Sequence, residues 1–203
     1  MGSGAIDLEQ PLGGTFDGGA CPHMAILLDS FGDVPAALAS FYALGLRRDG
    51  WLFHRALPGQ GEADREALTA AGLPVGELEA EGRFEICELP ISDPPETWAE
   101  PWVPLVEQRI AAGFDAVWWS RFPIGPDDGL YDLALRYDRY WEAAFHGRRA
   151  VSLCVYIVGG LDGSARDARV SDLREIHDRT ILVPADRSVT ALPREQQPAD
   201  VRG

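Results

Sequence analysis

The turn that follows the first buried stretch is the segment with the clearest chemical meaning. Residues 23–28, HMAILL, form a buried-strand pattern, and the turn after them, Asp29 to Asp33, carries two carboxylates and one glycine. A phosphate-binding loop at this place would offer several glycine N–H groups and a lysine. None of the 203 residues is a lysine, so all 18 basic residues are arginines. The sequence therefore predicts a nucleotide-binding layout without a functional P-loop, and it excludes Schiff-base lysine chemistry.

Polar and aromatic residues stand where the predicted parallel strands end. In open α/β sheets, ligands bind beyond the carboxyl ends of the strands, and small organic ligands favour apolar walls with a few polar groups. An arginine in such a site binds a carboxylate or carbonyl. The alternative is that the aromatic rings belong to the core and the polar groups contact solvent. The candidate ligand-binding residues are Asp29, His54, Arg55, Trp119, Arg121, Phe122 and Tyr156.

The sequence gives little support to catalysis. It contains neither a G-x-S-x-G elbow nor an H-E-x-x-H pair. Ser120, His54 and Asp29 are the types that a hydrolase triad uses, but Ser120 lacks the flanking glycines of a strained nucleophile turn. We therefore expect a protein that is not an enzyme.

No metal or other cofactor is predicted either. The three cysteines, Cys21, Cys87 and Cys154, are far apart and form no zinc-like spacing with histidine. We interpret Cys87 and Cys154 as small buried side chains in a reduced cytoplasm. For His23 we expect a capping or structural role at the amino end of the sheet. The alternative is a metal or haem ligand, for which no companion ligand stands at helical or strand spacing. For His177, near a helix end, we expect a helix-dipole contact.

Aromatic residues on one predicted amphipathic helix could either pack in the core or form a contact between subunits. Tyr137, Tyr140 and Trp141 fall on one face of a helix predicted over 130–146, which indicates core packing or a dimer face. Trp98 and Trp102, in a proline-rich connection, are expected to cover a pocket or an interface. We predict a homodimer.

Strand and helix patterns alternate along the chain, which is typical of an α/β domain with a mostly parallel sheet between two helical layers. About six strands are expected, and the domain should cover residues 21–185, between a flexible arm (1–20) and a flexible tail (186–203). The predicted strands are 23–28, 51–55, 83–89, 114–119, 150–158 and 180–183, and the last helix is predicted over 167–177.

The amino-acid composition argues against two classes of binding partner. The formal net charge is −14, which argues against nucleic acid and against anionic membranes. No stretch approaches the roughly 18 apolar residues of a membrane span, and the amino terminus lacks signal-peptide features. We therefore expect a cytoplasmic protein whose partners are a small molecule and another protein.

The order of short motifs resembles the MEDS family, the methanogen/methylotroph, DcmR sensory domain. The matching segments include His23 to Ser30, Gly82-Arg83, Gly113-Phe114, Tyr137-Asp138, the Cys154-Val155-Tyr156 strand and His177. Departures from the family pattern fall at Leu27-Leu28, at the 120–123 loop, at Ile157 and at Asp178. The resemblance implies a RecA/KaiC-like fold without a working P-loop. It also implies a role in sensing small, hydrocarbon-derived molecules for transcription regulation or kinase signalling.

Three functions remain open from the sequence. The first is a sensory domain that binds a small organic ligand and signals to a regulatory partner, such as a kinase, an anti-sigma factor or a transcription factor. The second is a ligand-free interaction module in kinase or anti-sigma partner switching. The third is an enzyme with an unrecognised site.

Overall fold

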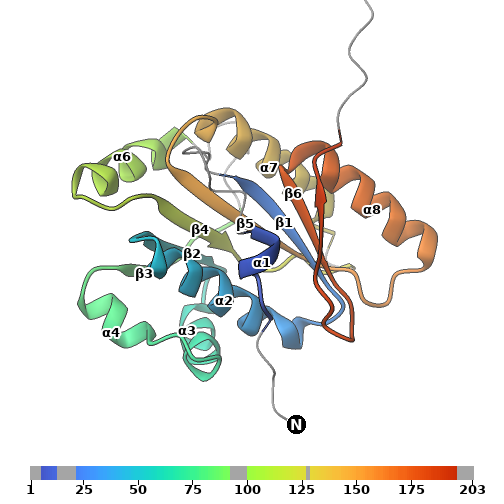
Figure 1. The fold of residues 1–203 in the computed structure, drawn as a ribbon, viewed down its shortest axis with the longest axis horizontal. Helices are drawn as coiled ribbons and strands as arrows, with labels where there is room; N and C mark the ends of the chain where they lie inside the picture. Colours follow the sequence, from blue (N-terminus) through green and yellow to red (C-terminus); the bar gives the residue numbers. More distant parts are fainter. Residues whose placement is uncertain (1–5, 13–21, 92–99, 127–128, 196–203) are drawn as a thin grey trace, which may run out of the picture.

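A single seven-stranded sheet organises the computed structural model, which describes residues 6–12, 22–91, 100–126 and 129–195 (Figure 1). The strand order is β3-β2-β4-β5-β1-β6-β7, and every neighbouring pair is parallel except the antiparallel pair β6 and β7. The strands are β1 His23–Leu28, β2 Trp51–Ala56, β3 Phe84–Glu88, β4 Val117–Arg121, β5 Ala150–Ile157, β6 Arg179–Val183 and β7 Thr190–Pro193. The predicted α/β class is confirmed.

Helices cover both faces of this sheet (Figure 1). Right-handed crossovers that run in opposite directions along the sheet must place their helices on opposite faces. On one face lie α1 Glu9–Leu12, α2 Val34–Arg47, α3 Gly61–Ala70 and α4 Val75–Ala80. On the other lie α6 Val103–Ala111, α7 Tyr131–Phe145 and α8 Gly163–Ile176. Two 3₁₀ turns, η2 Phe31–Asp33 and η3 Glu100–Trp102, precede α2 and α6.

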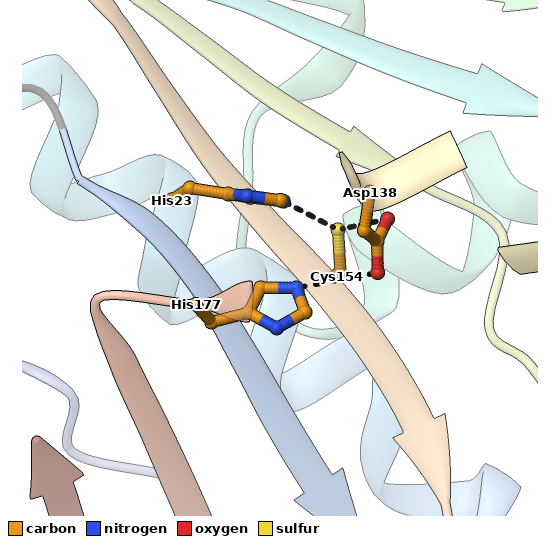
Figure 2. A group of neighbouring side chains, drawn as sticks. All are labelled: His23, Asp138, Cys154 and His177. Atoms are coloured by element: carbon orange, nitrogen blue, oxygen red, sulfur yellow. Dashed lines mark hydrogen bonds and ion pairs between the residues drawn. The ribbon is translucent and has the colours of Figure 1, made fainter. Parts of the chain in front are cut away.

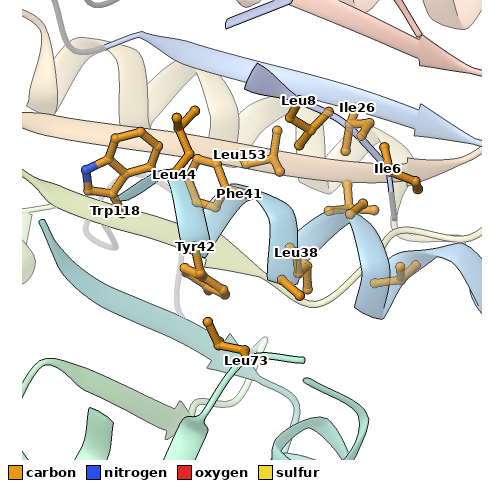
Figure 3. Close-up of a cluster of buried hydrophobic side chains, with 14 of the residues drawn as sticks. Ile6, Leu8, Ile26, Leu38, Phe41, Tyr42, Leu44, Leu73, Trp118 and Leu153 are labelled. Atoms are coloured by element: carbon orange, nitrogen blue, oxygen red, sulfur yellow. The ribbon is translucent and has the colours of Figure 1, made fainter. Parts of the chain in front are cut away.

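Side chains of the central strands alternate between two separate cores, as the pleat requires. From β1, Met24 and Ile26 pack under α2, whereas Ala25 and Leu27 face α7 and α8. Figure 3 shows the α2-side core, in which Phe41 and Tyr42 of α2 lie over the sheet near Trp118. Every residue of β1, β2, β4 and β5 is buried, because both faces of the sheet are covered.

The structure extends beyond the predicted domain limits at both ends. Ile6, Leu8 and Leu12 are buried in the α2-side core, so this part of the expected flexible arm is packed. In the expected tail, β7 pairs with β6 and adds the seventh strand. Residues 1–5, 13–21 and 196–203 of those two segments lie outside the described residues.

Two predicted boundaries were also wrong. The fourth strand begins at Val117 rather than at residue 114, because Gly113 ends the preceding helix with a positive φ of 106°. The last helix begins at Gly163, four residues before the predicted start, because the Asp162 side chain accepts a hydrogen bond from the Ala165 N–H and caps it. Of the described helices, none is long and apolar enough to cross a membrane.

Candidate functional site

A cluster of charged and polar side chains is buried between the sheet and α7. It contains His23 from β1, Arg121 from β4, Cys154 and Tyr156 from β5, Asp138 from α7, and His177, which ends α8. All six residues are at most 5% exposed. Figure 2 shows four of them, His23, Asp138, Cys154 and His177, converging from separate elements. We call these six residues the polar centre.

Asp138 is the hub of the polar centre. Its carboxylate accepts hydrogen bonds from Arg121 Nη2 at 2.9 and 3.2 Å, from the Tyr156 hydroxyl, and from Cys154 Sγ at 3.2 Å. Burial alone would raise the pKa of Asp138, but the adjacent Arg121 guanidinium holds that pKa well below its usual range. Burial and the Asp138 charge raise the pKa of Cys154 instead. The centre therefore contains a buried ion pair beside a neutral thiol.

The two histidines are oriented by contacts outside the centre. His177 Nδ1 lies 2.9 Å from the Leu173 carbonyl oxygen in the last turn of α8, as expected for a residue that contacts a helix end. His23 Nδ1 lies 3.4 Å from the Glu142 carboxylate. Burial and the neighbouring His177 lower the pKa of His23, so its ring is neutral at pH 7. Contacts with His23 and Arg194 lower the pKa of Glu142 to about 2.

Arg121 of the polar centre also lines a small cavity. Its volume is about 10 Å³, which is room for about one water molecule. Three predicted ligand-binding residues, Arg55, Arg121 and Phe122, lie in its wall. The remaining lining is almost entirely apolar: Ile91, Ile124, Leu130, Leu133, Ala134 and Tyr137.

The other four predicted site residues do not line this cavity. Tyr156 belongs to the polar centre, where its hydroxyl contacts Asp138 and Arg121. Trp119 is packed among Phe53, Trp102 and Trp141. Asp29 pairs with Arg166 at 3.0 Å and accepts a hydrogen bond from the Ala185 N–H, so it ties the β1 exit to two later segments.

His54 lies on the opposite face of the sheet from Arg55, because successive strand side chains alternate. Its Nδ1 lies 2.8 Å from Ser120 Oγ and its Nε2 lies 3.1 Å from Asp64 of α3. The Tyr42 hydroxyl of α2 completes this chain through contacts with Ser120 and His54. The single pocket expected from the sequence is thus divided by the sheet.

The Ser120–His54–Asp64 chain has the residue types of a hydrolase triad, with Asp64 in the place for which the sequence offered Asp29. Ser120 is fully buried beneath Tyr42, however, so its hydroxyl cannot reach a substrate from solvent. The chain joins α2 and α3 to β2 and β4, which is a structural role.

The aromatic stripe on α7 is core packing. Tyr137 and Trp141 are buried, and Trp102 packs against Trp119. Trp98 lies outside the described residues. Phe31 is the only large hydrophobic side chain exposed in the described part of the chain. Of the aromatic residues that motivated a homodimer, Tyr137, Trp141 and Trp102 pack within one subunit, whereas Tyr140 is half-buried. The homodimer stays a prediction.

Sequence reasoning named Asp138, Cys154, His23 and His177 only separately, as segments of a family resemblance or as single residues, and did not predict that they form one site. One signal was present: Asp138 falls on the same helical face as Ala134, Tyr137 and Trp141, where a carboxylate is costly unless it is paired. The partners themselves lie at positions 23, 121, 154, 156 and 177, and no local spacing connects them.

Comparisons with known proteins add no relatives: no family model matches the chain, and no curated protein matches it.

Proposed function

We propose that this chain is a sensory domain that binds a small, hydrocarbon-derived organic molecule and signals to a regulatory protein partner. The observation that carries the proposal is the cavity beside Arg55 and Arg121. These arginines are register partners on the neighbouring strands β2 and β4, at the carboxyl end of the sheet. That edge is where open α/β sheets bind ligands.

The chemistry of the cavity favours a small molecule with a carboxylate or carbonyl group. The Arg55 guanidinium is held by a 2.7 Å hydrogen bond from Nη2 to the Pro90 carbonyl oxygen and lies 5.6 Å from the Tyr137 ring centre. A guanidinium fixed in this way loses less side-chain entropy on binding a carboxylate than a mobile side chain would. The apolar walls would contact the hydrocarbon part of the ligand.

The cavity is so small that an organic ligand can bind only if part of the cavity wall moves. A ligand larger than water must displace a wall side chain, and Leu133, Ala134 and Tyr137 all come from α7. The same helix carries Asp138, the hub of the polar centre. Ligand entry would therefore shift α7, whose side chains contact three strands of the sheet. Such a shift would change the surface that a partner protein contacts, which is how ligand binding would be signalled.

Thermal-shift and calorimetric titrations with small carboxylic acids, ketones and halocarbons test the proposal. We expect at least one compound to stabilise the wild type, and Leu133→Ala, which enlarges the cavity, to bind it more tightly. Arg55→Leu should bind an acid at least tenfold more weakly, since a hydrogen bond to a charged group contributes about 2 kcal/mol. Arg109→Leu, which removes an arginine stacked on Trp51 elsewhere, serves as the control and should leave affinity unchanged.

An interaction module in kinase or anti-sigma partner switching is the second candidate. It is favoured by the filling of the cavity by the chain's own side chains. If no compound stabilises either the wild type or Leu133→Ala, and native mass spectrometry finds no bound organic molecule, this function replaces the sensory one. An enzymatic function has less support, because the triad-like Ser120 is fully buried.

A further inference from the structure

We propose that His23, Asp138, Cys154 and His177 bind one zinc ion. This inference goes beyond the small-molecule function and does not depend on it. Each residue offers one ligand atom, and these atoms all lie within 4.8 Å of one another in a fully buried site (Figure 2). Two imidazoles, a thiolate and a carboxylate are ligand types that zinc takes in proteins. Cys154 holds its thiol proton without the ion, so zinc binding would form the Cys154 Sγ–zinc bond and release that proton to solvent.

Three contacts between the four residues lie close to the separations of a tetrahedral ion, and the ligand atoms all lie within 4.8 Å of one another. Bonds of about 2.3 Å to sulfur and about 2.0–2.2 Å to nitrogen or oxygen place neighbouring ligand atoms roughly 3.3–3.6 Å apart. His23 Nε2 lies 3.5 Å from Cys154 Sγ. Cys154 Sγ lies 3.2 Å from Asp138 Oδ1, and His177 Nε2 lies 3.2 Å from Asp138 Oδ2. Binding would therefore require the more distant ligand atoms to move closer together and one Asp138 oxygen to serve as the ligand.

The orientation of His177 supplies an independent reason for a cation. A carbonyl oxygen can only accept, so the contact with Leu173 places the proton of a neutral ring on Nδ1. The Nε2 lone pair then faces the Asp138 carboxylate across 3.2 Å. Nε2 is buried and has no hydrogen-bond partner among the residues that the structure describes. Two facing acceptors in a buried site require a proton or a metal ion between them.

The surrounding contacts are those that support metal ligands. Ligating histidines usually donate their second N–H to a carboxylate or a backbone carbonyl, and ligating carboxylates are hydrogen-bonded in turn. The Leu173 carbonyl takes this place for His177, and the Glu142 carboxylate lies 3.4 Å from His23 Nδ1, where it would accept that N–H once the ion is bound. Arg121 and Tyr156 contact Asp138 in the same way. Glu142 is therefore a positioning residue for His23.

Four protein ligands leave no open coordination position, so the ion would be structural rather than catalytic. It would join α7 to β1, β5 and the α8–β6 junction. Because such binding is coupled to folding, zinc would stabilise the region on which the cavity wall depends.

The test uses the full-length chain, purified in a reducing buffer without chelator. We expect one zinc per chain by plasma mass spectrometry. After exchange with Co²⁺ we expect a thiolate-to-cobalt charge-transfer band and the visible bands of tetrahedral cobalt. Cys154→Ser should abolish the charge-transfer band and weaken binding more than a hundredfold. The double variant Cys21→Ser/Cys87→Ser, which alters only the other two cysteines, should retain both. Glu142→Gln should weaken binding about 10–100-fold in competition with a chelating indicator.

Each contrary result is informative. A folded wild type that holds no zinc and gives no cobalt bands after metal is added would overturn the proposal and leave a proton between His177 and Asp138. A charge-transfer band that persists in Cys154→Ser, or disappears in the double variant, would show that a different cysteine binds the ion. Failure of this proposal is distinguishable from failure of the proposed function, because the organic-ligand titrations compare wild type with Arg55→Leu, and Arg55 lies outside the polar centre.

Discussion

At the scale of single residues, the buried pair Arg121–Asp138 should dominate the energetics. Removing one partner of a buried ion pair leaves the other charge uncompensated and typically costs about 3–5 kcal/mol. We therefore expect Arg121→Met to lower the free energy of unfolding by about that amount in urea titrations. The guanidinium donates to Asp138 at 2.9 Å and both side chains are almost fully buried.

Arg109→Met is the matched control. Arg109 is partly exposed, lies 3.6 Å from Glu85 and stacks on Trp51, so its loss should cost only about 1 kcal/mol. Equal losses of unfolding free energy in the two variants would show that the buried Arg121–Asp138 pair stabilises the protein no more than the partly exposed Arg109 contacts do. Because Arg121 is paired with Asp138, its substitution also destabilises the fold. Substitution of Arg55 is therefore the better test of ligand binding.

At the scale of elements, the exits of β1 and β5 are packed backbone to backbone. The Val158 N–H donates to the Leu28 carbonyl oxygen at 2.8 Å, and a Cβ on Gly159 would lie 1.8 Å from the Asp29 carbonyl oxygen. Because that neighbour is backbone, it cannot move aside cheaply. We expect Gly159→Ala to destabilise the protein by about 3 kcal/mol, measured by denaturant unfolding.

Gly163→Ala provides the comparison. No atom lies within 4 Å of the Cβ position at Gly163, the first residue of α8. Alanine is the better helix former, so this variant should be neutral or more stable by up to about 1 kcal/mol. A Gly159→Ala variant as stable as the wild type would mean that the two strand exits can separate.

At the scale of the whole molecule, we expect no tight binding or hydrolysis of ATP. The net charge is −14, the chain has no lysine, and the turn after β1 carries Asp29 and Asp33. A phosphate at that turn would meet carboxylates and the tightly packed Gly159 rather than a cradle of N–H groups.

Calorimetric titration with Mg-ATP should give no micromolar dissociation constant. Asp29→Asn/Asp33→Asn, which removes both carboxylates, should not create a site, since the lysine and the glycine loop are still missing. Micromolar affinity in the wild type would contradict this prediction.

The sequence by itself determined the layers and most of the elements. Residues 23–28 and 150–157 are apolar except at His23 and Ser152, which is typical of a strand covered on both faces, and glycines or prolines separate them from amphipathic helices. The absence of lysine from the composition alone excluded a P-loop lysine and a Schiff-base lysine. Boundaries that depend on a cap, as at Asp162, or on pairing with a distant strand, as in β7, were missed because their energy comes from contacts outside the local pattern.

Only the tertiary structure decided which polar residues meet. Because side chains alternate along a strand, His54 lies on the α2 side of the sheet and Arg55 on the α7 side. The residues of the one expected pocket are therefore divided between the His54 hydrogen-bond chain and the cavity beside Arg55. Residues 23, 138, 154 and 177 share no spacing, yet parallel register aligns β1 with β5 and α7 crosses above them. The physical reason is that a sheet joins strands by long crossovers, so proximity at its centre is set by strand order and not by distance along the chain.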